Sequence, residues 1–139
     1  MTHSNIVKIY HKETDCYGVV WHGEYIKWFE IGRIEFSELI GISFNILNKM
    51  GILLPVVEIN CRYKSPARLM DKLSILTELK ELKNTSITFF HAIKNIDTDN
   101  LILNATSTVV TTNKEGKLFK KIPDYLYEKY VEYLNNKLK

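Results

Sequence analysis

An aspartate and a histidine stand seven residues apart in the segment from Glu13 to Tyr25 of this 139-residue chain. Asp15 lies where a loop is predicted, and His22 lies at the predicted start of a long helix. A positioned carboxylate can attack a carbonyl carbon, or it can activate a water molecule as a general base. The residues alone do not decide whether Asp15 is a turn residue or a catalytic carboxylate. They also do not decide whether His22 is a surface residue or part of a site.

The predicted helix start lacks a good capping residue. Ser, Thr, Asp and Asn are the usual N-caps, because a side-chain oxygen accepts hydrogen bonds from the first free N–H groups. The candidates in this chain are Trp21, His22 and Gly23, and none of them is a strong cap. We therefore expect free N–H donors there. If they face a cavity, they would stabilise a carbonyl oxygen that gains negative charge, assisted by the helix dipole.

Hydrophobic periodicity separates one long helix from the strands that follow it. The long helix is predicted from a row of residues at steps of three and four, which is the helical period, and Gly41 ends that segment. The row is Ile26, Phe29, Arg33, Phe36 and Ile40. Later segments alternate between apolar and polar residues and are joined by short polar turns, which predicts antiparallel hairpins. The expected strands are 5–11, 52–65, 72–83, 86–96 and 101–112, and the expected helices are 22–40, 43–50 and 124–138.

This order of elements predicts an α+β fold. A helix of about 19 residues spans about 28 Å, and strands of this length can wrap one antiparallel sheet of about five strands around it. The absence of βαβ alternation and of a glycine-rich fingerprint excludes a Rossmann fold. The chain has no repeat or long linker, so we expect residues 1–139 to form a single domain.

Composition narrows the function further. The net charge is only +3, from 19 basic and 16 acidic residues dispersed along the chain, which does not favour a nucleic-acid partner. No apolar run is long enough to cross a membrane, and Met1 to Tyr10 lacks the core of a signal peptide. Cys16 and Cys61 lack the spacing of a metal site. We expect a cytoplasmic protein with reduced thiols and no membrane association.

Two motifs resemble one family. The segment ETDCYGVVWHGEYIKWFEIGRIEF is similar to the acyl-CoA thioesterases of the 4-hydroxybenzoyl-CoA thioesterase type, within the hotdog-fold superfamily. Their pattern is D-x-D-x-x-G-V/I-V-Y/W-H/Y-x-x-Y, followed by F-E-x-x-R, and Glu13 stands where they commonly have Asp. The segment from Tyr63 to Asp71 resembles their Y-x-x-P-A-R-L-x-D. The first pattern is matched at Asp15, Gly18, Val19, Val20, Trp21, His22, Tyr25, Phe29, Glu30 and Arg33.

The resemblance implies a hotdog fold and hydrolysis of an acyl-CoA thioester to a free acid and CoA. It implies that Asp15 is the catalytic carboxylate, as nucleophile or as general base. It also implies that the backbone N–H of His22 polarises the thioester carbonyl, while the His22 side chain lines the site. CoA is part of the substrate, so no separate cofactor and no metal are expected.

The residues around Asp15 are expected to bind substrate. Seven of the sixteen aromatic residues fall between positions 17 and 44. We expect Tyr17, Trp21 and Tyr25 to surround the site together with Gly18, which would let the loop approach the substrate closely. Tyr25 and Trp28 could equally contact a second subunit. Three further expectations are a buried, hydrogen-bonded His91, an inert Cys16 thiol, and a structural role for Glu30 and Arg33 at a dimer interface.

The resemblance further implies a homo-oligomer, a dimer formed by joining two sheets edge to edge and a homotetramer formed from two dimers. Two other functions remain open at this level. A hydratase or dehydratase would use His22 paired with Asp15 to move a proton, and a binding module would hold an acyl thioester without turnover. Neither the acyl group nor the choice between CoA and acyl carrier protein follows from the residues.

Overall fold

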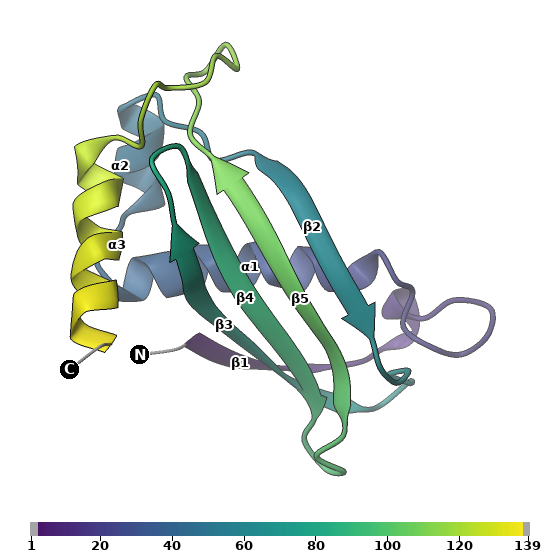
Figure 1. Cartoon of the computed structure of the whole chain (residues 1–139). Coiled ribbons are helices and arrows are strands. Elements are labelled where there is room, and N and C mark those ends of the chain that lie inside the picture. Colours follow the sequence, from purple (N-terminus) through teal and green to yellow (C-terminus); the bar gives the residue numbers. More distant parts are fainter. Residues whose placement is uncertain (1–2, 138–139) are drawn as a thin grey trace.

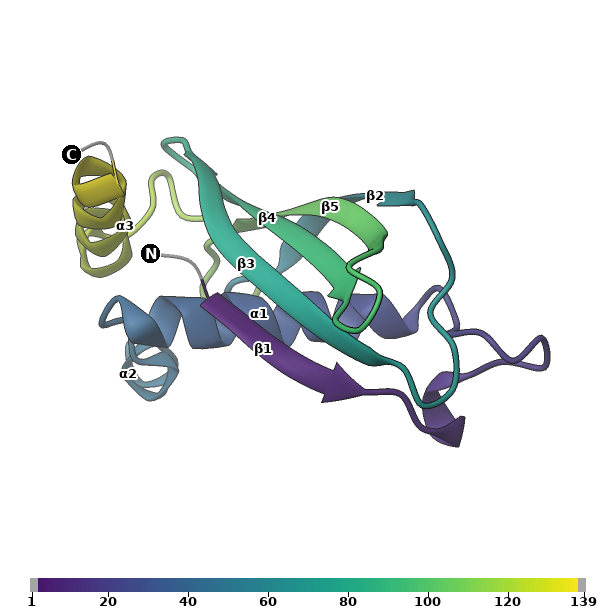
Figure 2. The same cartoon turned by 90° about the horizontal axis from the view of Figure 1, so that it is seen from below.

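One five-stranded antiparallel sheet packs a long helix against one of its faces in the computed structural model, which describes residues 3–137 (Figures 1 and 2). The strands are β1 (His3–Lys8), β2 (Val56–Tyr63), β3 (Lys72–Leu82), β4 (Ser86–Asn95) and β5 (Leu101–Val110). The helices are α1 (Glu24–Leu39), α2 (Phe44–Lys49) and α3 (Asp124–Lys137), with a 3-10 turn, η1, at His11–Glu13. The predicted α+β order of elements is confirmed.

The strand order is β1-β3-β4-β5-β2, and every neighbouring pair is antiparallel. The two predicted hairpins, β3–β4 and β4–β5, form the centre of the sheet. β2 returns to pair with β5, and Ile59 lies opposite Ser107. β1 and β2 are therefore the two edges of the sheet, and each offers one unpaired side to another chain.

Several element boundaries differ from the prediction, and the second strand, for example, covers Val56–Tyr63 and not residues 52–65. The first strand ends at Lys8 and not at residue 11, because the chain turns into η1 and the Tyr10 N–H donates to Glu13 Oε1 at 2.8 Å. The long helix begins at Glu24 and not at residue 22. The final helix matches its prediction as far as Lys137, and the predicted last residue, Leu138, lies outside the described part of the chain.

The buried face of α1 is offset from the predicted row. Ile26 is 43% exposed, whereas Tyr25 and Trp28 are buried in the core. Gly32 lies on the buried face, and a Cβ there would overlap Thr77 Oγ1 of β3. The helix therefore approaches the sheet closely at this point, which only a residue without a side chain allows.

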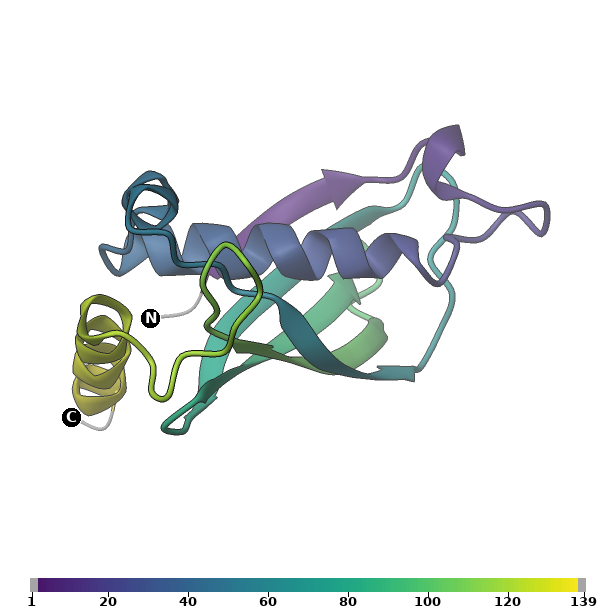
Figure 3. The same ribbon diagram turned by 90° about the horizontal axis from the view of Figure 1, so that it is seen from above.

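The end of α1 is packed against the two other helices. Figure 3 shows α2 and α3 at this end, with α3 (yellow) standing beside it. Tyr133 of α3 packs edge-on against Phe36 of α1, with 5.0 Å between the ring centroids, and Tyr130 is fully buried. Among residues 3–137 no helix is both long and apolar enough to span a bilayer.

Candidate active site

The loop of residues 14–20, which contains Asp15, extends beyond the sheet at the end opposite α2 and α3 (Figure 1). A bridge between Thr14 and Val20 closes this loop, and Gly18 makes its turn at a φ of 79°. Asp15 Oδ1 accepts the N–H of Tyr17 at 2.8 Å. Within residues 3–137 Asp15 Oδ2 accepts no hydrogen bond, and the side chain is partly exposed. One carboxylate oxygen is thus held in place and the other is available for chemistry.

Glu13 anchors the base of the loop. Its side chain is buried, Oε1 accepts the N–H of Tyr10, and its carbonyl accepts the N–H of Trp21 at 3.0 Å. The bond from Trp21 fastens η1 to the chain that enters α1. The residue that departs from the usual family aspartate therefore has a structural role, because its carboxylate is bonded to the start of η1.

The two sequence motifs lie side by side. The Val20 N–H donates to the carbonyl of Ala67 at 2.8 Å, and Val19 forms a bridge with Arg68. The second motif therefore supports the loop that carries Asp15, although some forty residues separate the two motifs in the chain. Its first residue, Tyr63, donates from Oη to the carbonyl of His22 at 3.2 Å. The motif was visible in the sequence, but this contact was not.

The start of α1 is uncapped, as predicted. Gly23 is the N-cap residue and makes no side-chain cap. The Glu24 N–H donates to the carbonyl of Trp21 at 2.9 Å. In a trans peptide the C=O and the next N–H point in opposite directions, so this bond turns the N–H of His22 outward from the helix. In the described chain that N–H has no hydrogen-bond acceptor.

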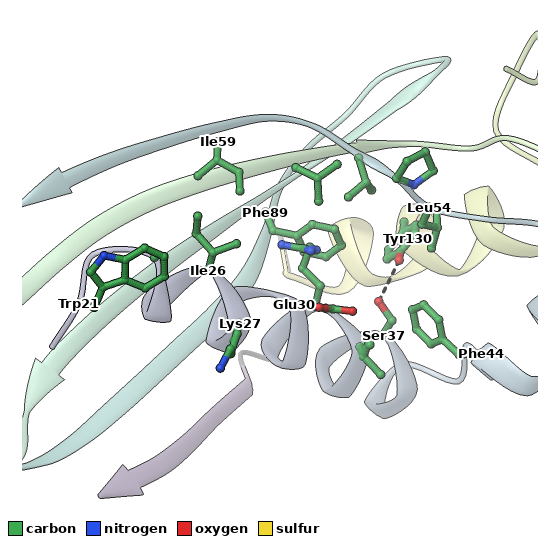
Figure 4. Close-up of a pocket in the computed structure, with 16 residues that line it drawn as sticks. Trp21, Ile26, Lys27, Glu30, Ser37, Phe44, Leu54, Ile59, Phe89 and Tyr130 are labelled. Atoms are coloured by element: carbon green, nitrogen blue, oxygen red, sulfur yellow. Dashed lines mark hydrogen bonds between the residues drawn. The ribbon is translucent and has the colours of Figure 1, made fainter. Parts of the chain in front are cut away.

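Two cavities flank this helix start. The larger, here called the α1–β2 groove, has a volume of about 630 Å³ and runs along α1 from Trp21 to Ser37 (Figure 4). Its volume lies within the range of ligand pockets. The smaller cavity, of about 320 Å³, is lined by His22, Tyr25 and Lys64 among others. Both cavities adjoin the first turn of α1, so a ligand in either would lie close to the uncapped helix end.

The predicted substrate-binding residues divide among these features. Trp21 is 51% exposed and lines the groove, with its ring 4.9 Å from that of His22. Tyr25 is buried, and burial raises its pKa to about 12, so its hydroxyl stays neutral. Tyr17 is 83% exposed on the Asp15 loop beside Gly18. In a single chain, Asp15 and Tyr17 line neither cavity.

His91 is buried and hydrogen-bonded, as predicted. Nδ1 pairs with Thr77 Oγ1 at 3.0 Å, Nε2 pairs with Ser107 Oγ at 2.8 Å, and the ring stacks on Phe29. Burial, followed by the charge of Arg33, lowers the pKa of His91 to about 3, so the ring is neutral at pH 7. Arg33 Nη1 donates to Ser107 Oγ at 3.1 Å. This network fastens α1 to β3, β4 and β5.

A long helix held against one antiparallel five-stranded sheet is the architecture of the hotdog-fold thioesterases. Residues 9–130 match the family model described as the thioesterase-like superfamily. The chain belongs to this family, and the fold and enzyme class predicted from the two motifs are confirmed.

Individual relatives agree with this assignment. The acyl-CoA thioester hydrolase YbgC of Escherichia coli is 33% identical over 104 residues, which cover 75% of this chain and 76% of YbgC. The acyl-acyl carrier protein thioesterase ATL3 of Arabidopsis thaliana is 28% identical over 132 residues, covering 95% of this chain and 69% of ATL3. The structure of the DHNA-CoA thioesterase from Staphylococcus aureus superposes with a TM-score of 0.87 at 26% identity, covering 99% of this chain and 95% of that one.

Proposed function

We propose that this protein hydrolyses acyl-CoA thioesters to a carboxylic acid and CoA, with Asp15 and the backbone N–H of His22 as the reacting groups. The observation that carries the proposal is the outward, unpaired N–H of His22 at an uncapped helix start. Such a donor, already oriented before the reaction, stabilises an oxygen that becomes negative in the transition state. The positive end of the helix dipole acts in the same direction.

Asp15 can act in either of two ways. As a nucleophile, its free Oδ2 attacks the thioester carbon, the C–S bond breaks, CoA leaves as a thiol after gaining a proton, and water then hydrolyses the mixed anhydride. As a general base, it takes a proton from the water that attacks the same carbon. In both cases the hydrogen bond from Tyr17 N–H to Oδ1 fixes the direction of the carboxylate.

The active assembly we propose is a dimer joined through the free edge of β2. Val57 on this edge is 60% exposed, and Val56 and Ile59 of the same strand line the groove. A second copy paired antiparallel to β2 would extend the sheet and cover the groove, consistent with the two-fold symmetry of most homodimers. It would also bring a second surface toward the exposed Asp15 loop. Two such dimers would form the proposed tetramer.

CoA is the carrier that the proposal assigns, and acyl carrier protein is the alternative. Both present the acyl group on the same phosphopantetheine thiol, and the name of ATL3 specifies acyl carrier protein as its carrier. Lys64 lines the smaller cavity beside His22 and is exposed, so it can attract the phosphates of either carrier. We place the protein in the cytoplasm, where the free thiols of Cys16 and Cys61 would stay reduced.

The mechanism is tested by Asp15→Asn, assayed against a panel of acyl-CoA esters with a free-thiol reagent. Losing a positioned acid–base group or nucleophile should lower kcat/KM at least about 100-fold. Asp97→Asn, in the exposed turn between β4 and β5, is the matched control and should retain the wild-type rate. A folded Asp15→Asn variant with near wild-type turnover would refute the mechanism.

The same panel separates the two alternative functions. A hydratase would add water to a 2-enoyl thioester without releasing a thiol, whereas hydrolysis releases one thiol for each ester consumed. A binding module would show affinity for the ester by calorimetry but no turnover. Thiol release that depends on Asp15 is the result we expect.

A further inference from the structure

We infer that the α1–β2 groove holds a long straight-chain acyl group, and that Tyr130 of the C-terminal helix sets the longest chain that fits. This inference rests on the proposed thioester hydrolysis and specifies its substrate class. Figure 4 shows the groove beginning at Trp21, beside the helix start, and ending where Tyr130, Phe44 and Leu54 come together.

The length of the groove argues for a chain rather than a ring. Its lining extends from Gly23, the N-cap of α1, to Ser37, a length of about 21 Å at 1.5 Å per residue. The hydrocarbon core of a bilayer is two acyl chains deep and about 30 Å thick, so one fatty acyl chain spans about 15 Å. A single aromatic ring attached to the thioester would reach only the first part of the groove.

The walls of the groove are mainly apolar. Six residues supply aliphatic or aromatic surface from α1, β2, β4 and β5, namely Ile26, Ile34, Val56, Ile59, Phe89 and Val109. Three charged residues, Lys27, Glu30 and Arg33, also line the groove. Lys27 and Glu30 are exposed to solvent, and Arg33 is bonded through Nη1 to Ser107. An apolar chain would therefore gain free energy with each methylene that it places against these walls.

Tyr130 forms a fixed end wall. It is fully buried, its Oη pairs with Ser37 Oγ at 2.9 Å, and its ring packs edge-on against Phe89. Burial raises the pKa of Tyr130 to about 12, so the hydroxyl stays neutral and keeps its bond to Ser37. The neighbouring helix is tied to the same wall, because the Ser43 N–H donates to Tyr125 Oη. A wall held at these points limits chain length.

The test measures kcat/KM for the wild-type protein on straight-chain esters from butanoyl-CoA to octadecanoyl-CoA, with benzoyl-CoA and an ω-carboxyacyl-CoA for comparison. We expect a rise of about fourfold per methylene up to a limit, then a fall. Tyr130→Leu should move the optimum to longer chains, so that an ester two methylenes past the wild-type limit gains about tenfold. Leu54→Trp, which adds volume at the same end, should move it to shorter chains.

A control variant in the same helix separates the wall from general stability. Tyr133→Ala removes an even larger volume from the same helix, but Tyr133 packs on Phe36 and does not line the groove, so its chain-length profile should be unchanged. Calorimetric binding of the corresponding free fatty acids supplies a readout that needs no turnover.

The outcomes distinguish this inference from the proposed function. A wild-type protein that binds fatty acids up to a length set by Tyr130, yet cleaves no ester, would refute the proposed hydrolysis and support the groove. Hydrolysis that favours benzoyl-CoA or the ω-carboxyacyl ester would refute the groove and leave hydrolysis standing. A folded Tyr130→Leu variant whose optimal chain length is unchanged would also refute the role of the groove and leave hydrolysis standing.

Discussion

At the residue scale, His22 contributes through its backbone more than through its ring. Its N–H points outward because the preceding carbonyl is held by Glu24, and its own carbonyl is held by Tyr63. The imidazole ring is exposed to solvent and lies beside the ring of Trp21. In the proposed mechanism the atom that matters at this position is therefore one that every amino acid except proline carries.

A pair of substitutions at position 22 tests this role. His22→Ala keeps the N–H and should retain most of the wild-type kcat. His22→Pro removes the N–H and should lower kcat by about 100- to 1,000-fold, the usual effect of losing one oxyanion donor. The circular dichroism spectrum and the midpoint of thermal unfolding of each variant report whether α1 still forms. Equal activities in two folded variants would show that the N–H takes no part.

At the scale of elements, the contact between α1 and the sheet is polar at its centre. Thr77, His91 and Ser107 come from three neighbouring strands and meet Arg33 of the helix. Burying such groups is tolerated because each ring nitrogen of the neutral histidine has a partner. Gly32 makes the approach possible, since a Cβ there would overlap Thr77. The register of the helix on the sheet is therefore fixed by these contacts.

The neutral His91 predicts how stability depends on pH. Its folded-state pKa of about 3 lies below the ordinary value of 6.5, so the unfolded chain binds an extra proton between these values. The free energy of unfolding should consequently fall as the pH drops through this range, by up to about 1.4 kcal/mol per pH unit from this group. Urea unfolding of wild type and His91→Gln between pH 7 and pH 4 measures the effect.

The free energy of unfolding of His91→Gln should depend less steeply on pH than that of the wild type, whatever the stability of the variant at pH 7. His11→Gln, at an exposed histidine of η1, is the matched control and should keep the wild-type slope. Parallel curves for wild type and His91→Gln would mean that His91 takes up no proton on unfolding in this range.

At the scale of the whole molecule, the Asp15 loop, the α1–β2 groove and α3 are arranged in order along α1. The Asp15 loop lies at one end of the helix and α3 at the other, and the α1–β2 groove runs from Trp21 at the first end to Tyr130 at the second (Figures 3 and 4). Asp15 is held in its turn by the N–H of Tyr17, but it lines neither the groove nor the smaller cavity of its own chain. A second copy placed against β2 would supply the missing wall, which is why we propose that the active form is a dimer.

Charge placed on either edge of the sheet tests that assembly. Val57→Lys on β2 should weaken the dimer and lower activity, because it introduces like charges where two copies would meet. Ile6→Lys is the control on the opposite edge strand, where Ile6 is similarly exposed at 69%. It should leave the molecular mass of the assembly unchanged. Light scattering after size-exclusion chromatography measures both. Dissociation caused by Ile6→Lys alone would place the interface on β1.

Much of the local structure could be predicted from the residues themselves. Strand and helix periods, the turns between β3, β4 and β5, and the weak cap at Gly23 are local properties, and each is confirmed. The two motifs also predicted the family. The offset of the buried face of α1 was missed, because Arg33 and Ile26 follow the helical period although neither is in the core. Side-chain type alone does not tell which of two overlapping rows meets the sheet.

The sequence by itself determined the order of elements, the uncapped helix start and the family, because these depend on neighbours along the chain. Only the tertiary structure decided that Tyr63 orients the His22 peptide, that Glu13 anchors the Asp15 loop, and that Tyr130 closes the groove. Each of those contacts, except that of Glu13, joins residues tens of positions apart. Such pairs are set by how the sheet and helices pack, and no local pattern encodes that packing.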